Sequence, residues 1–445
     1  MNFVEAEKKL AACGQRHVLE YWKKLSASER KALLEQIASL DARDLAHCRR
    51  ALSGAADVAD SSGGKAPKVA KLKGKALRAA VLAGEKELKA GRVAALLVAG
   101  GQGSRLGFDG PKGAYSIGPV SGASLFHFHA RKILARSIRY GATIPFYVMT
   151  SAANNADTVR VFEENDYFGL NPEDVFFFIQ GMWPAMTAEG KVILDSPGHI
   201  FMSPDGHGGL LAALHRSGAL ADMKKRKIES VFFFQVDNPL VEIADPAFIG
   251  FHVMEKSEYS LKLCAKRDPF EKVGIPMLFG KTCRMVEYTE MTEEQCLRKK
   301  GGSLYFLYGS PAIHVFSRAF LEREAKKAMP LHLAHKKIPM VVDGKIVKSD
   351  EPNGYKFEKF IFDILPNARK AAFLAFDQEE EFSPVKNAAG ADSPATCRAD
   401  MQRKWRRMLA DAGVSVPEGM PLEIDPVYAL DAGDLKSIGL FLSAD

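Results

Sequence analysis

A glycine-rich stretch with two cations is the part of the sequence best suited to chemistry. Residues 100–107 read Gly-Gly-Gln-Gly-Ser-Arg-Leu-Gly, and Pro111-Lys112-Gly113 follows. Glycines after a buried strand let backbone N–H groups approach phosphate oxygens without a Cβ in the way. Arg105 and Lys112 add the mobile positive charge that an attack on a triphosphate needs, both on the attacked phosphoryl group and on the leaving pyrophosphate. The stretch predicts a nucleotide site cradled by Gly100, Gly101 and Gly103.

Two commoner phosphate motifs do not fit this stretch. The dinucleotide fingerprint needs G-x-G-x-x-G and an acid about twenty residues later. Here the third glycine falls one place late, and residues 120–128 contain no acid. The P-loop needs G-K-[ST], whereas Lys112 lies between a proline and a glycine. A glycine-rich turn without a ligand is the alternative for the glycines alone, but the two cations favour a phosphate site over it.

Polar side chains also follow two other apolar runs. Asp237 comes directly after the run 230–236, which places a carboxylate at the carboxyl edge of the expected sheet. Mg²⁺ prefers one or two carboxylates completed by phosphate oxygens and water, so Asp237 is a candidate Mg²⁺ ligand, with an ordinary turn residue as the alternative. Gln180 ends the run 175–180, and residues 203–209 form a second glycine-rich stretch that opens a helix.

Short apolar runs separated by helical stretches predict the sheet that positions these residues. The segments 125–139 and 210–224 have the length and periodicity of crossover helices. We therefore expect a Rossmann-like α/β catalytic domain over residues 91–387 with a mainly parallel sheet. Its expected strands are 93–99, 146–150, 175–180, 230–236 and 261–265.

Shorter parts flank this domain. Residues 1–90 read as a helical N-terminal segment with a capping box at Ser26–Glu29, followed by a flexible connection at 53–67. Residues 388–445 read as a small C-terminal domain, with a helix carrying Met401, Trp405 and Leu409 and then short strands and turns over 414–442.

Composition narrows the class of protein. Apolar residues make up 47% and charged residues 26% of the 445, as in a globular protein, and the net charge of +7 favours anionic partners. The dense basic runs 224–227 and 298–300 lack interleaved aromatics, which is typical of solvated helix ends and loops and not of a nucleic-acid site. Six scattered cysteines show no metal-ligand spacing, and no apolar run is long enough to span a bilayer, so we expect a cytoplasmic protein without a membrane partner.

The motif series resembles a known family, the eukaryotic-type UDP-sugar pyrophosphorylases, and within it the UDP-N-acetylhexosamine pyrophosphorylases. The family loop is written L-A-G-G-Q-G-T-R-L-G followed by P-K-G, and Val98 and Ser104 are among the few differences here. Further motifs recur in the same order from about Ser26 to the C-terminus. The resemblance implies a GT-A-like nucleotidyltransferase fold.

The resemblance also implies roles for individual residues. Gln180 matches the residue that reads the uracil edge, which a buried amide can do by leaving groups unpaired with a wrong base. Lys386 matches a lysine that reaches the phosphates. Other positions match residues near the uridine (Gly206 and Gly208), residues that hold sugar hydroxyls (Gly274, Glu287 and Tyr288) and aromatics that line the acetyl pocket (Phe360 and Phe362).

Two positions depart from the acetylhexosamine pattern. His207 stands where those enzymes carry Asn, whereas glucose-type relatives carry G-H-G. It could donate to a sugar hydroxyl or acetamido oxygen, or order its own loop. Ser310 replaces the asparagine expected to meet the acetamido group.

The resemblance implies that UTP and N-acetylglucosamine 1-phosphate give UDP-N-acetylglucosamine and pyrophosphate, with Mg²⁺ as cofactor and Arg105, Lys112 and Lys386 as the catalytic cations. A UDP-glucose or broad UDP-sugar pyrophosphorylase is one alternative, supported by His207 and Ser310. A nucleotide-sugar-binding protein without catalysis is another, against which the retained cations and Asp237 count.

Overall fold

The computed structural model describes residues 1–55 and 61–438 and divides them between two compact units. Unit 1 comprises Met1–Asp60, Gln180–Leu210 and Ala328–Asp363, and unit 2 comprises Ser61–Ile179, Leu211–Lys327 and Ile364–Asp445. This division differs from the consecutive segments 1–90, 91–387 and 388–445, because strands from the middle of the chain group with the N-terminal helices. None of the described helices has the length and apolar character needed to cross a bilayer.

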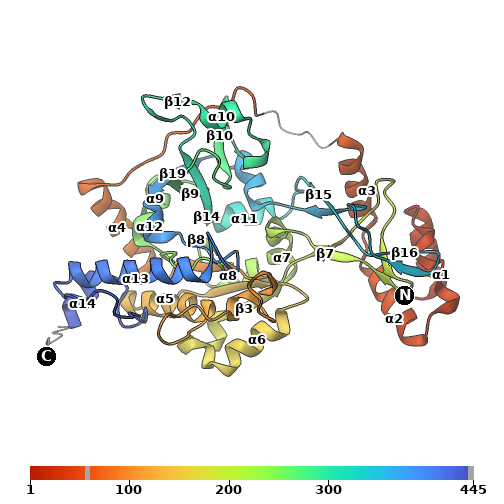
Figure 1. The fold of residues 1–445 in the computed structure, drawn as a ribbon, viewed down its shortest axis with the longest axis horizontal. Coiled ribbons are helices and arrows are strands. Elements are labelled where there is room, and N and C mark those ends of the chain that lie inside the picture. Colours follow the sequence, from red (N-terminus) through yellow and green to blue (C-terminus); the bar gives the residue numbers. More distant parts are fainter. Residues whose placement is uncertain (56–60, 439–445) are drawn as a thin grey trace. The chain divides into compact units, whose positions relative to one another are not determined.

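Unit 2 is built on a seven-stranded sheet in the order β19-β9-β14-β8-β1-β2-β3 (Figure 1). Only β14 runs antiparallel to its neighbours, so the other six strands end at one edge. The mainly parallel α/β sheet predicted from the apolar runs is confirmed. The strands are β1 (Val93–Val98), β2 (Phe146–Thr150), β3 (Val175–Ile179), β8 (Ser230–Gln235), β9 (Tyr259–Ala265), β14 (Tyr308–Ser317) and β19 (Ala371–Phe376).

The central strands β1, β2 and β8 are apolar runs, and nearly all of their residues are buried. Parallel strands that are covered on both faces have this composition. One core joins Ala95 and Leu97 of β1 to Phe126 of α5 and to Trp405 of α13. The helices of unit 2 are α4 (Gly74–Lys89), α5 (Leu125–Tyr140), α6 (Asn155–Glu164), α8 (Ala219–Lys225), α9 (Pro246–Met254), α10 (Glu293–Leu297), α11 (Arg318–Glu324), α12 (Gln378–Glu381), α13 (Pro394–Asp411) and α14 (Ala432–Ile438).

Two predicted elements of unit 2 were wrong. The helix expected over 210–224 is two helices, α7 (Leu210–Arg216) and α8, because Gly218 adopts a φ of +81° that ends the first and caps the second. The strands expected over 414–442 are not found among the described residues, which end at 438 and instead contain α14. The remainder of that segment, 439–442, lies outside the described residues.

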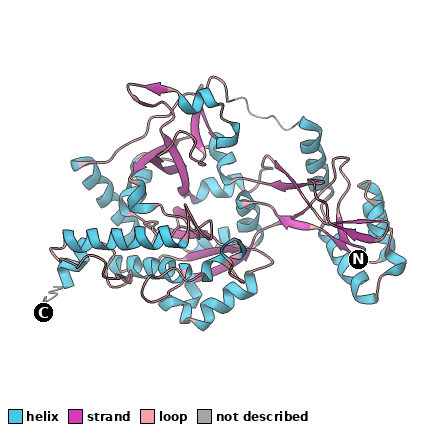
Figure 2. Ribbon diagram, in the orientation of Figure 1, coloured by secondary structure: helices cyan, strands magenta, loops and turns pink. Residues whose placement is uncertain are grey.

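Unit 1 combines N-terminal helices with short antiparallel strand pairs (Figure 2). The predicted capping box is present at the start of α2, where Ser26 and Glu29 cap each other's backbone. The connection predicted over 53–67 falls partly on residues 56–60, outside the described part. The elements of unit 1 are α1 (Phe3–Ala12), α2 (Ala27–Ser39), α3 (Ala42–Arg50), β4 (Met182–Pro184), β5 (Leu194–Ser196), β6 (His199–Ile200), β7 (Met202–Pro204), β15 (His332–Lys336), β16 (Met340–Val342), β17 (Lys345–Val347) and β18 (Gly354–Glu358).

Candidate functional site

The loop after β1 is fixed by its own backbone and by one buried asparagine. The backbone N–H groups of Gly103 and Lys112 donate to the carbonyls of Gly110 and Gly101, at 2.9 and 3.0 Å. Asn154, fully buried, donates to the Gly101 carbonyl and to the carbonyl just before the loop. An added Cβ at Gly101 would meet nothing within 4 Å, so the backbone there is open to a ligand. A Cβ at Gly103 would lie 2.6 Å from the Phe108 ring, so Gly103 has a packing role as well.

Lys112 and Asp237 come together at the carboxyl edge of the sheet. β1 and β8 are adjacent parallel strands, so the segments that follow them meet at one edge. The Lys112 Nζ lies 3.7 Å from Asp237 Oδ2, with the side chains 17% and 14% exposed. Arg105 is exposed on the same loop. The arrangement places a cation and a carboxylate where ligands of α/β folds bind.

Asp237 fits a magnesium site of the kind that a nucleotide completes. No group of three or more His, Cys, Asp or Glu side chains in the described residues could hold a metal by itself. Mg²⁺ is usually bound by one or two carboxylates together with phosphate oxygens and water. A single carboxylate beside a phosphate-type loop matches that donor set, whereas it would not suit a structural zinc site.

The segment before Lys386 lies against the turn that carries Asp237. The backbone N–H of Val385 donates to the Asp237 carbonyl at 2.8 Å. Lys386 is half-exposed, with its Nζ 3.8 Å from Asp392 and 5.6 Å from the centre of the Phe382 ring. The predicted phosphate lysine is therefore brought next to the predicted metal ligand along the backbone.

Three of the four predicted sugar residues of unit 2 lie close together. The Ser310 N–H donates to the Gly274 carbonyl at 2.9 Å, and an added Cβ at Gly274 would lie 3.2 Å from Glu287 Oε1. The Ser310 hydroxyl accepts from the N–H of Ala312 at 3.4 Å. Tyr288 begins the short turn after Glu287 and is 39% exposed.

In unit 1, His207 lies in a stack of rings. Its imidazole stacks on Phe360, with centroids 5.3 Å apart and planes 15° apart, and Phe362 packs at 5.5 Å. His332 also stacks on Phe360, with ring centroids 4.1 Å apart. The N–H of Ile361 donates to His207 Nδ1 at 3.1 Å, so the neutral ring carries its hydrogen on Nε2.

His207 Nδ1 is therefore taken up by the backbone of Ile361, and the Nε2–H is left as a donor, so both roles predicted for His207 stay predictions. Burial, together with the positive charge that His332 can carry, lowers the pKa of His207 to about 4. Phe360 and Phe362 follow β18 as half-buried rings and are not part of a strand core.

The second glycine loop is packed tightly against the chain that follows β18. A Cβ at Gly206 or Gly208 would lie 2.5 or 2.6 Å from backbone atoms of Lys359. Gln180, which begins the second segment of unit 1, is 8% exposed and directly follows β3. Of the predicted nucleotide residues in unit 1, Gly206 and Gly208 are therefore held by backbone packing.

The sequence did not single out a charged cluster beside this loop. Asp205 is 1% exposed, and the Lys359 Nζ lies 3.7 Å from its carboxylate and 4.2 Å from the centre of the Trp183 ring. Because Trp183 and Lys359 are far apart in the sequence, no local pattern links them. An aspartate inside a Ser-Pro-Asp-Gly turn was the one available signal, and it reads equally as a turn residue.

A mainly parallel sheet with Lys112 and Asp237 at its carboxyl edge defines an α/β protein of the nucleotide-binding class. Comparison with known proteins identifies the family. A family model described as UTP–glucose-1-phosphate uridylyltransferase matches residues 63–391. The human UDP-N-acetylhexosamine pyrophosphorylase-like protein 1 is 38% identical over 431 residues, covering 91% of this chain and 85% of that protein.

A probable UDP-N-acetylglucosamine pyrophosphorylase of Dictyostelium discoideum is 38% identical over 371 residues, or 78% of this chain and 76% of that protein. The crystal structure of the uridine diphosphate N-acetylglucosamine pyrophosphorylase of Trypanosoma brucei superposes with a TM-score of 0.85 at 29% identity, covering 97% and 93% of the two chains. The chain belongs to the UDP-sugar pyrophosphorylase family, as the motif series predicted, and has its nucleotidyltransferase-like fold.

Proposed function

We propose that the chain transfers the uridylyl group of UTP to N-acetylglucosamine 1-phosphate, giving UDP-N-acetylglucosamine and pyrophosphate. A phosphate oxygen of the sugar phosphate forms the new bond to the α-phosphorus of UTP, and the bond between that phosphorus and the bridging oxygen to the β-phosphate breaks. The observation that carries the proposal is the approach of Lys112 to Asp237 within 3.7 Å at the carboxyl edge of the sheet, in a chain of this family.

No general base is required, because the sugar phosphate is already an anion. Catalysis then depends on positioning and on neutralising charge. Lys112 and Arg105 are suited to the charge that spreads over the α-phosphate and the leaving pyrophosphate. Lys386 is proposed to assist them, because it directly follows Val385, whose backbone N–H donates to the Asp237 carbonyl. A Mg²⁺ ion held by Asp237 would supply a Lewis acid for the phosphate oxygens.

The sugar is the finer part of the proposal. Relatives named for UDP-N-acetylglucosamine and UDP-N-acetylhexosamine support an acetylated sugar. The glucose-type alternative is supported by His207 and Ser310, because both depart from the acetylhexosamine pattern. The six buried free thiols support the predicted cytoplasmic location, where thiols stay reduced.

The test is pyrophosphate release by the purified protein with UTP and Mg²⁺, compared across the 1-phosphates of N-acetylglucosamine, N-acetylgalactosamine, glucose and galactose. We expect the highest kcat/KM with N-acetylglucosamine 1-phosphate and no release in excess EDTA. A preference for glucose or galactose 1-phosphate would show that the chain is a UDP-glucose or broad UDP-sugar pyrophosphorylase. UTP binding without release for any sugar would instead support a nucleotide-sugar-binding protein.

A further inference from the structure

The turn 236–242, which carries Asp237, is held from two sides by buried polar side chains. We propose that Asn238 and Lys132 are positioning residues that fix this turn, and that they set the affinity of the site for the divalent ion. The proposal rests on the proposed function, in which Asp237 is the ion's protein ligand. Neither residue is among the candidate site residues predicted from the sequence.

Asn238 joins the turn to the segment before Lys386. Its side chain is 4% exposed and uses both ends of the amide: Nδ2 donates to the Glu381 carbonyl at 2.7 Å, and Oδ1 accepts from the Ser383 N–H at 3.1 Å. Only an amide both donates and accepts in this way, so neither an aspartate nor a leucine of the same size would replace it.

A backbone hydrogen bond at Asp237 joins the same two segments. The Val385 N–H donates to the Asp237 carbonyl at 2.8 Å, so three consecutive hydrogen bonds join residues 237–238 to residues 381–385. A shift of the turn would therefore displace Asp237 and Lys386 together. A metal ligand and a phosphate lysine that must meet one triphosphate gain from such a fixed relation.

The far end of the connection is tied to the sheet. Lys262 lies on β9 and is 1% exposed, and its Nζ donates to both oxygens of Glu381, at 2.5 and 2.7 Å. The same Nζ lies 2.8 Å from Asp245 Oδ2, just before α9. A buried cation shared by two carboxylates leaves the residue that receives the Asn238 hydrogen bond little freedom to move.

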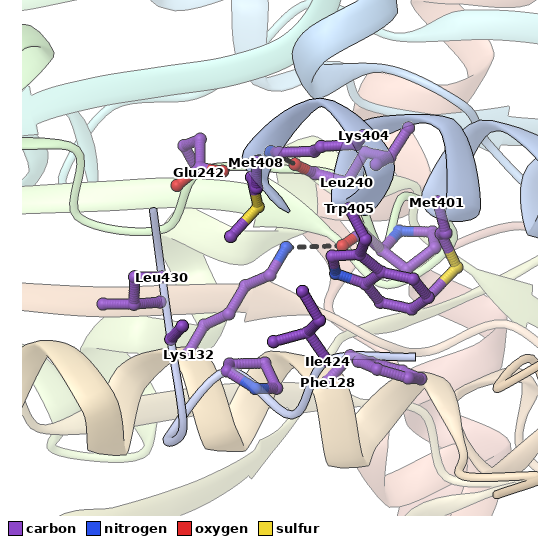
Figure 3. Close-up of a pocket in the computed structure, with 13 residues that line it drawn as sticks. Phe128, Lys132, Leu240, Glu242, Met401, Lys404, Trp405, Met408, Ile424 and Leu430 are labelled. Atoms are coloured by element: carbon purple, nitrogen blue, oxygen red, sulfur yellow. Dashed lines mark hydrogen bonds and ion pairs between the residues drawn. The ribbon is translucent and has the colours of Figure 1, made fainter. Parts of the chain in front are cut away.

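Lys132 supports the turn from the helix side. It extends from α5, and its Nζ donates to the carbonyls of Pro239 and Val241, at 2.5 and 2.9 Å. Glu242 at the end of the turn pairs with Lys404 of α13 and with Arg136 of α5. Lys132 lines a small cavity of about 30 Å³. Figure 3 shows its side chain among mainly apolar ones, with Glu242 and Lys404 as the charged neighbours.

This arrangement predicts an effect on the metal ion more than on the fold. Partners that orient a metal ligand typically change metal affinity or activity 10- to 100-fold when they are removed. We therefore expect Asn238→Ala to raise the Mg²⁺ concentration for half-maximal turnover about 10- to 100-fold, with kcat largely restored at saturating Mg²⁺. A merely structural asparagine would lower Tm and leave the Mg²⁺ requirement unchanged.

A matched control exists in unit 1. Asn353 also donates and accepts with backbone groups, accepting from the Ile338 N–H at 2.8 Å and donating to the Ile338 carbonyl at 2.9 Å. Asn353→Ala should lower Tm by a similar amount and leave the Mg²⁺ requirement at the wild-type value. The second arm is Lys132→Met, which keeps an unbranched side chain one atom shorter and removes both hydrogen bonds to the turn. It should raise the Mg²⁺ requirement as Asn238→Ala does.

The decisive readout does not need turnover. Calorimetric titration of Mg²⁺ into each protein at saturating UTP, without sugar phosphate, should show weaker ion binding for Asn238→Ala and Lys132→Met and wild-type binding for Asn353→Ala. Wild-type ion affinity in both of the first two variants would overturn the positioning roles. If Asn238→Ala does not fold, Lys132→Met decides. A wild-type protein that binds Mg²⁺ with UTP but releases no pyrophosphate would overturn the proposed function alone.

Discussion

The two glycine-rich loops use the same residue for different purposes. In the loop at 100–113 of unit 2, Gly101 borders open space and two cations stand nearby in the sequence. In the loop at 203–209 of unit 1, an added Cβ at Gly206 or Gly208 would clash with backbone. One loop therefore leaves room for a ligand, and the other uses glycine to pack closely against its own chain.

The charged groups beside the two loops also differ in how open they are to a ligand. Lys112 has a carboxylate partner at 3.7 Å that a metal ion could take over. The second loop also has a lysine 3.7 Å from a carboxylate, Lys359 and Asp205, but that carboxylate is 1% exposed, and His207 there is stacked on Phe360 with its Nδ1 occupied by a backbone N–H. Glycine content and a nearby lysine therefore do not separate the predicted phosphate loop from a loop that packs on its own chain, whereas open backbone and an accessible carboxylate do.

The largest effect should come from the cation of the first loop. Lys112→Ala removes the charge that the proposed function assigns to the α-phosphate, and the loss of one such group typically costs about 10²- to 10³-fold in kcat. Lys89→Ala is the control, since Lys89 is exposed and its only ion pair within the described part of the chain is with Glu85 at 3.6 Å, one turn away on α4. Steady-state turnover with saturating UTP and Mg²⁺ measures both. A kcat for Lys112→Ala within a factor of three of wild type would remove this residue from the mechanism.

The second loop should respond in stability. A Cβ at Gly209 would lie 1.9 Å from Oδ1 of Asp205, which is 1% exposed and has Lys359 beside it. Gly209→Ala should therefore destabilise the protein by about 1–3 kcal/mol, the usual cost of overpacking a filled site. Urea unfolding followed by circular dichroism measures the change. An unchanged midpoint would mean that the carboxylate moves aside freely.

Gly101→Ala is the opposite case and sharpens the contrast. The added methyl group has nothing within 4 Å, so the unfolding midpoint should stay at the wild-type value. If a phosphate approaches this backbone, the methyl group keeps it away, and UTP binding should weaken by roughly tenfold, or about 1.4 kcal/mol. Fluorescence or calorimetric titration of UTP tests this. Unweakened binding would show that the triphosphate lies elsewhere on the loop.

The sheet could be predicted from the sequence because a strand that is buried on both faces consists of consecutive apolar residues. The run 146–150 is predicted with the same ends as β2, since all five residues are buried between neighbours. The end of the first helix before Gly218 could not be predicted, because the apolar periodicity continues across this glycine into α8. The prediction for the segment after α13 was also wrong: Ile424 and Ala429 lie in a stretch interpreted as short strands, yet in the structure they pack into the core of unit 2 and lie outside its strands.

The candidate site was predicted only in part, for a related reason. Lys112 and Asp237 each follow a strand, so parallel topology brings them together without further information. The contacts of Asn238 with residues 381–383 join segments more than a hundred residues apart, and no local pattern announces such a pairing. The same holds for Lys359 and Trp183 in unit 1.

The smallest expected effect concerns the pH dependence of the second loop. Burial lowers the pKa of His207 to about 4, below its ordinary value of 6.5, so between these values the unfolded chain binds a proton that the native state does not. Its contribution to stability is therefore complete above pH 6.5 and is lost as the pH falls towards 4. His207→Asn keeps an acceptor for the Ile361 N–H and cannot titrate, so its unfolding free energy should fall less between pH 7.5 and pH 5 than that of the wild type. Some slope should remain, because burial also lowers the pKa of His129 and His252 in unit 2, to about 3 and about 4. Identical losses for the variant and the wild type would show that His207 is protonated in the native state, and its stack on Phe360 would then have to accommodate a cation.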